Sequence, residues 1–139
     1  MIRIRLVALG AAAAVIAAAL GIRAATSGDL AKYAGDALYT VLLYALVVAV
    51  APRVRPLVAA SVALGVSWAV EFAQLTSVPA TLSAHSTLAR LALGSTFNAP
   101  DLFWYAVGAA CAYGVHRACG GGWRPNRPQL SGAYPNRPL

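Results

Sequence analysis

The sequence predicts an all-α integral membrane protein: a bundle of four transmembrane helices, with a short interfacial helix between the third and fourth helices and a disordered C-terminal tail. Hydrophobic residues make up 60% of the 139 residues and charged residues only 11%, whereas an ordinary soluble domain is about 25% charged. The apolar residues gather in three long stretches and a shorter fourth one, and a bilayer core needs roughly 20 mostly apolar residues per helix. We therefore expect one transmembrane domain over residues 1–119, followed by the tail over residues 120–139.

The first apolar stretch runs from Leu6 to Ile22 and follows Arg3 and Arg5. Its charged start and alanine-rich centre would also suit a cleaved signal peptide. The apolar run is longer than the roughly 7–15 residues that are typical of a signal peptide. For this reason we favour a retained helix over a cleaved one.

The second helix is expected to begin near Asp36, after a polar loop over residues 23–35. It continues to Ala51, where Pro52 stops it, because proline has no backbone N–H to donate and disfavours the helical conformation in the residue before it. A short basic turn that contains Arg53 and Arg55 then leads into the third helix.

The third helix, Leu57 to Leu75, is the clearest spanning segment. Small side chains recur every fourth residue along it, at Ser61, Gly65, Ala69 and Ala73. This spacing places them on one stripe, where another helix can approach closely in lipid. The stripe leaves two interpretations open, because it could pack within the bundle or form a homo-oligomer.

A mixed segment precedes the fourth helix. Its centre, Ser86 to Leu93, has leucines at helical spacing and predicts the short interfacial helix. The fourth helix follows, from Asp101 to about Ala118. The tail beyond it repeats Pro-Asn-Arg-Pro, and this composition favours disorder. Because the tail is basic, we expect it to contact anionic lipid headgroups.

The net charge of +7 is better explained by membrane topology than by nucleic-acid binding, because the membrane segments contain no basic helix. If all four helices span, one side carries eight basic residues: Arg3, Arg5, Arg53, Arg55, Arg117, Arg124, Arg127 and Arg137. The other side carries three: Arg23, Lys32 and Arg90. The positive-inside rule then places both termini in the cytoplasm and predicts a multi-pass membrane protein.

All four acidic residues fall on or near the outer side, and Glu71 lies within a predicted span. A carboxylate at the centre of a membrane helix costs roughly 2.5–3.5 kcal/mol on insertion scales and usually has a polar partner. Gln74 lies one helical turn beyond Glu71, and Arg90 is the expected counter-charge. The predicted polar cluster consists of Asp36, Glu71, Gln74, Arg90 and Asp101.

The cluster has several interpretations. It could be a salt-bridge network that fixes helix packing, or an outward-facing pocket for the headgroup of an envelope lipid or a lipid-linked cell-wall precursor. In a membrane enzyme, Glu71 or Asp101 would act as a general acid or base, and in a small transporter the carboxylates would carry protons. His85 alone beside scattered acids is weak evidence for a metal, so we expect no metal and no cofactor. A non-enzymatic protein with membrane lipids as partners is the favoured interpretation.

The same polar positions carry a resemblance to known families. The segments concerned are Gly35–Tyr44 (GDALYTVLLY), Glu71–Leu75 (EFAQL), Arg90, Leu93–Phe97 (LGSTF) and Asp101–Gly108 (DLFWYAVG). Together they resemble the bacterial membrane family known as domain of unknown function 2809, and more distantly they are similar to the VanZ-like family. The resemblance implies a small multi-helix protein of the bacterial inner membrane without an established mechanism. It also implies that the five cluster residues are the positions to carry over.

Overall fold

The computed structural model describes residues 1–120, and these form six α-helices joined by short connections. The helices are α1 (Ile2–Ala25), α2 (Asp29–Val50), α3 (Pro56–Ala73), α4 (Val78–His85), α5 (Thr87–Leu93) and α6 (Ala99–Gly120). The predicted disordered tail lies outside the described residues, apart from Gly120. The all-α prediction is therefore confirmed for the part of the chain that the structure describes.

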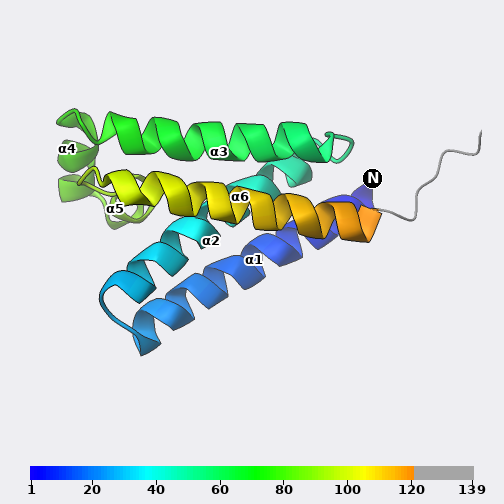
Figure 1. The fold of residues 1–139 in the computed structure, drawn as a ribbon, viewed down its shortest axis with the longest axis horizontal. Helices are drawn as coiled ribbons and strands as arrows, with labels where there is room; N and C mark the ends of the chain where they lie inside the picture. Colours follow the sequence, from blue (N-terminus) through cyan, green and yellow to red (C-terminus); the bar gives the residue numbers. More distant parts are fainter. Residues whose placement is uncertain (121–139) are drawn as a thin grey trace, which may run out of the picture.

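The four long helices pack into one bundle (Figure 1). α1 lies along α2, and α6 packs against both α2 and α3. The two short helices, α4 and α5, lie beside each other at the end of the bundle where α3 stops and α6 starts. The N-terminus lies towards the opposite end of the bundle.

Among residues 1–120, three helices are long and apolar enough to cross a membrane: α1, α2 and α3. Large apolar side chains cover their outer faces, and on α1 the exposed fractions of Leu6 and Val7 are 62% and 72%. A fully exposed stripe of this kind is unfavourable in water and favourable in lipid. α6 has 22 residues but is not among these three candidate spans.

Two elements differ from the expectations. α2 begins at Asp29, not near Asp36, because Gly28 adopts a positive φ of 73° and turns the chain directly from α1 into α2. The polar residues that suggested a loop are therefore helical. Between α3 and α6 the chain forms two short helices where we expected one; α5 matches the predicted segment and α4 is additional.

The face of α3 that packs within the bundle is also different from the predicted one. Ala59, Ala63 and Ser67 are fully buried, whereas Ser61 and Gly65 of the predicted stripe are exposed. Small residues do let the helices approach closely, as expected in lipid. The small residues at this contact are Ala59, Ala63 and Ser67, and not those of the predicted stripe. The predicted stripe therefore faces away from the bundle.

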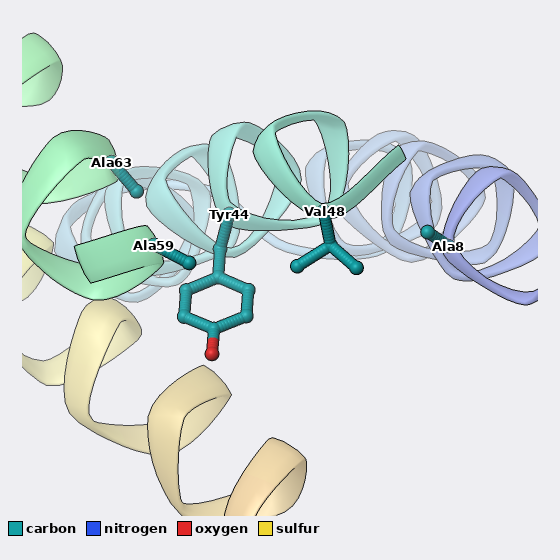
Figure 2. Packing of buried hydrophobic residues seen from close by; sticks show 5 residues of the cluster. All are labelled: Ala8, Tyr44, Val48, Ala59 and Ala63. Atoms are coloured by element: carbon teal, nitrogen blue, oxygen red, sulfur yellow. The ribbon is translucent and has the colours of Figure 1, made fainter. Parts of the chain in front are cut away.

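Close packing continues on α2 and α6. A Cβ atom built on Gly108 of α6 would overlap the backbone carbonyl of Ala37 on α2, so only glycine fits at this crossing. At the end of the bundle nearer the N-terminus, a small apolar core joins α1, α2 and α3 (Figure 2); it consists of Ala8, Tyr44, Val48, Ala59 and Ala63. The bundle thus has an apolar core at one end, and polar residues gather at the other.

Candidate functional site

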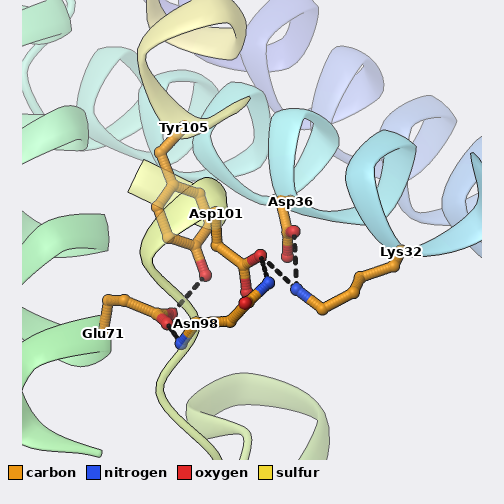
Figure 3. A network of polar contacts seen from close by, with 6 residues as sticks. All are labelled: Lys32, Asp36, Glu71, Asn98, Asp101 and Tyr105. Carbon is orange, nitrogen blue, oxygen red and sulfur yellow. Dashed lines mark hydrogen bonds and ion pairs between the residues drawn. The ribbon is translucent and has the colours of Figure 1, made fainter. Parts of the chain in front are cut away.

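Polar side chains from three helices and one loop meet at the end of the bundle that is covered by α4 and α5 (Figure 3). The site forms there because the polar residues lie near the N-terminal ends of α2 and α6 and in the last turn of α3, and their side chains point towards one another (Figure 3). We call this set the polar cluster; it consists of Lys32, Asp36, Glu71, Asn98, Asp101 and Tyr105.

Glu71 is the most buried member, with an exposed fraction of 1%. Its Oε1 accepts a hydrogen bond of 2.6 Å from the backbone N–H of Asn98, and its Oε2 accepts one of 3.0 Å from the Tyr105 hydroxyl. Both carboxylate oxygens therefore have donors, as a buried charged group requires. These bonds tie the end of α3 to the start of α6.

Asp101 occupies the first turn of α6 and is 4% exposed. It accepts a hydrogen bond of 2.5 Å from the side-chain amide of Asn98 and forms an ion pair with Lys32. Lys32 also lies 3.5 Å from Oδ2 of Asp36, one turn further along α2. One ammonium group thus bridges carboxylates on two helices.

Lys32, and not Arg90, supplies the counter-charge. Arg90 is exposed on α5 and takes part in neither of the ion pairs found among residues 1–120. The difference follows from the early start of α2, which makes Lys32 part of a helix and places it at i−4 from Asp36. The four-residue spacing of Lys32 and Asp36 can be read from the sequence, but it brings the two side chains together only when both residues belong to one helix.

Gln74 lies beside the cluster and fixes the loop between α5 and α6. Its side-chain N–H donates to the carbonyl of Leu93 at 2.6 Å. The next residue, Gly94, has a positive φ of 63°, and a Cβ atom there would lie 2.7 Å from the Gln74 amide nitrogen. The Ser83 hydroxyl of α4 donates to the carbonyl of Gly94 at 2.8 Å. The loop that presents Asn98 is therefore held by side chains of α3 and α4.

The structure thus brings Asp36, Glu71 and Asp101 to one end of the bundle, with Gln74 at their side, and leaves Arg90 apart. Sequence reasoning missed Lys32 and the donor role of Asn98. The Asn98 bond uses a backbone N–H, which no residue pattern could indicate. His85 is exposed at the end of α4, and the described residues hold no group of three metal-ligating side chains.

A cavity of about 860 Å³ opens beside the polar cluster. Its lining includes Lys32, Asp36, Glu71 and Asp101 together with Arg23 at the end of α1. The exposed surface of the cavity is largely apolar, and many of its apolar residues come from α1, α2 and α5; they include Val15, Ile16, Leu20, Leu38, Leu88 and Leu91. Polar residues of the α1–α2 turn and of the α5–α6 loop also line it. A single cavity therefore combines a charged region with an apolar wall.

The chain was compared with known protein families, curated proteins and solved structures. A family model described as "Protein of unknown function (DUF2809)" matches residues 25–109. The matched range includes the whole polar cluster, the first half of α6 and the loop that carries Asn98. No curated protein and no solved structure matches the chain.

Proposed function

We propose that this chain, which belongs to the DUF2809 family of proteins of unknown function, is a membrane protein that binds the polar head of an amphipathic lipid in the cavity beside the polar cluster. The observation that carries the proposal is the composition of this cavity, whose charged residues and apolar wall lie side by side. Such a lining suits a ligand that has both a polar head and an apolar chain.

In this proposed arrangement, α6 is a fourth membrane-spanning helix. Its 22 residues give it the length that a bilayer requires. Its outer face carries apolar side chains, and Phe103 and Val115 are 63% and 64% exposed. α6 packs against α2 and α3, which are themselves candidate spans. If α6 lay outside the membrane, α2 and α3 would have to leave the lipid with it.

The distribution of arginines supports one orientation. Arg3 and Arg5 begin α1, Arg53 and Arg55 lie between α2 and α3, and Arg117 lies in the last turn of α6. All five are exposed and belong to the end of the bundle away from the polar cluster. By the positive-inside rule, this end faces the cytoplasm when the protein lies in a bacterial inner membrane. The cavity then opens on the outer side of the membrane. Envelope lipids and lipid-linked cell-wall precursors are then the accessible ligands.

Binding is better supported than catalysis. A general acid or base must reach the atom whose proton it transfers, but Glu71 and Asp101 are 1% and 4% exposed and already accept hydrogen bonds within the protein. The groups that a ligand can reach are Lys32 and Asp36, whose side chains are 40% and 18% exposed. We therefore assign Glu71 and Asp101 to positioning of the helices, and Lys32 and Asp36 to contact with the ligand.

Filling the cavity tests the proposal. Ala19 lines the cavity, whereas its neighbour Ala18 is exposed on α1 outside it. The variants Ala19→Trp and Ala18→Trp add the same side chain to the same helix. The full-length protein is reconstituted in nanodiscs made from the polar lipid extract of the expression host and analysed by native mass spectrometry.

We expect wild type and Ala18→Trp to retain one lipid, and Ala19→Trp to lose it because the indole occupies its place. Circular dichroism and gel filtration show whether both variants remain folded. Equal lipid retention by the two folded variants would refute binding in this cavity.

A further inference from the structure

The cavity beside the polar cluster extends along α1 and α2 into the apolar part of the bundle. On α1 its lining runs from Arg23 back to Val15, which is about 12 Å of helix. On α2 it reaches Leu42, about 20 Å along the helix from Asp29. Half of the hydrocarbon core of a bilayer is about 15 Å thick. The cavity is therefore deep enough to hold an acyl chain of one leaflet.

The side chains at the edge of the cavity belong both to its lining and to the surface of the protein. Leu20 of α1 is 55% exposed and Leu88 of α5 is 77% exposed, and both line the cavity. A lining residue that is also largely exposed lies where the cavity meets the surface. Ile16 of α1 and Leu91 of α5 have the same two properties. We call the opening that these four apolar residues edge the portal.

The two helices that edge the portal are not packed against each other. Among residues 1–120, α1 packs extensively only against α2, and α5 only against α4. The end of α5 is tied to α3, because the Gln74 side chain donates to the carbonyl of Leu93. This bond fixes the far side of the cavity and leaves the portal between α1 and α5 open.

The position of the portal on α1 points to lipid as the medium outside it. α1 is a candidate membrane span that ends at Ala25. Leu20 and Ile16 lie about 8 and 14 Å along the helix from that end. An apolar edge at this depth is unfavourable in water, but in a bilayer it meets the acyl chains. Lys32 and Asp36 lie nearer the end of the bundle, at the level of the headgroups.

We propose that the cavity opens sideways into the bilayer through the portal, so that a phospholipid of the adjacent leaflet enters it without passing through water. One acyl chain then lies in the cavity against Leu38 and Leu42 of α2, and the head lies at Lys32 and Asp36. This inference rests on the proposed function, because it names the source and the entry route of the ligand of the same cavity.

The test uses a phospholipid that carries a photoreactive diazirine in the middle of one acyl chain. The full-length protein is reconstituted in liposomes that contain this lipid, irradiated and digested, and mass spectrometry locates the labelled residues. We expect label at Leu38 or Leu42, which are half-buried and line the cavity. A short-chain, water-soluble analogue with the same head and diazirine, added outside liposomes of ordinary lipid, should not label these residues. This comparison uses wild-type protein and does not depend on the folding of a variant.

Two variants show whether the label at Leu38 and Leu42 comes from a chain inside the cavity. Ala19→Trp fills the cavity and should abolish it, whereas Ala18→Trp on the outer face of α1 should preserve it. Leu46 is exposed on α2 outside this cavity, so its label should be the same in both variants.

The possible failures separate the portal from the proposed function. Label on outer positions such as Leu46 but never at Leu38 or Leu42 would overturn the portal, and the proposed function would stand if Ala19→Trp still loses the retained lipid. Equally strong labelling of Leu38 and Leu42 by the soluble analogue would show that the cavity fills from water and would overturn entry from the bilayer. Lipid retention that Ala19→Trp does not alter would overturn the proposed function, and the portal with it.

Discussion

Replacement of Glu71 measures what the polar cluster contributes to stability. The carboxylate accepts two hydrogen bonds, from the Asn98 N–H and the Tyr105 hydroxyl. A hydrogen bond to a charged group contributes about 1.5–3 kcal/mol, and a neutral one about 0.5–1.5 kcal/mol. Glu71→Ala loses both bonds and leaves two donors unpaired, so we expect a loss of about 3 kcal/mol in the free energy of unfolding. Glu71→Gln keeps an acceptor for Asn98, and the Tyr105 hydroxyl can rotate to accept from the new amide, so we expect a loss of about 1 kcal/mol.

The assay is unfolding of the full-length protein by sodium dodecyl sulfate in mixed micelles, followed by far-ultraviolet circular dichroism. Asp29→Asn is the control, because an exposed substitution should change stability by less than about 0.5 kcal/mol. The reasoning is refuted if Glu71→Ala is as stable as this control. A buried carboxylate without useful partners would give that result, or even a gain in stability, since its removal would abolish a desolvation cost.

Two further substitutions probe the helix contacts. Gly108→Ala should destabilise the fold by about 1–3 kcal/mol, because its Cβ atom would overlap the Ala37 carbonyl; Gly114→Ala, which meets nothing within 4 Å, should be neutral or slightly stabilising in the same unfolding assay. Lys32→Met should lower the unfolding free energy by about 1–3 kcal/mol, because the buried Asp101 loses its cation. Lys32→Arg should recover most of this loss, and equal stability of the Met and Arg variants would exclude a stabilising ion pair.

The helices themselves could largely be predicted from the sequence. Pro52 and Pro56 mark the turn between α2 and α3, and the apolar runs indicate where the long helices lie. The start of α2 was missed because Asp29 and Lys32 are polar and follow a glycine, which is also the composition of a loop. They are helical because Gly28, with its positive φ, starts α2 directly after α1, and composition does not report a backbone conformation.

The candidate site could be predicted in part. The carboxylates stand out because charged residues are costly in apolar segments, and the i, i+4 spacing of Asp101 and Tyr105 places them on one face of a helix. The partner of Glu71 could not be predicted, because a backbone N–H of the α5–α6 loop supplies it. The choice of Lys32 over Arg90 as counter-charge likewise depends on the early start of α2, which places Lys32 one helical turn before Asp36. Local patterns identify the costly residues, and the tertiary fold selects their partners.

Accessibility of single cysteines in intact cells tests the membrane arrangement most directly. In a background without Cys111 and Cys119, cysteines are introduced at Ser27, Ala51 and Thr87, which are exposed positions in the connections and at the start of α5. We predict that a membrane-impermeant maleimide labels Ser27→Cys and Thr87→Cys from outside, and Ala51→Cys only after the membrane is permeabilised. Labelling of Ala51→Cys alone in intact cells would turn the cavity towards the cytoplasm and contradict an envelope ligand. Labelling of Ser27→Cys and Thr87→Cys from opposite sides would separate Lys32 from Asp101 and contradict the polar cluster itself.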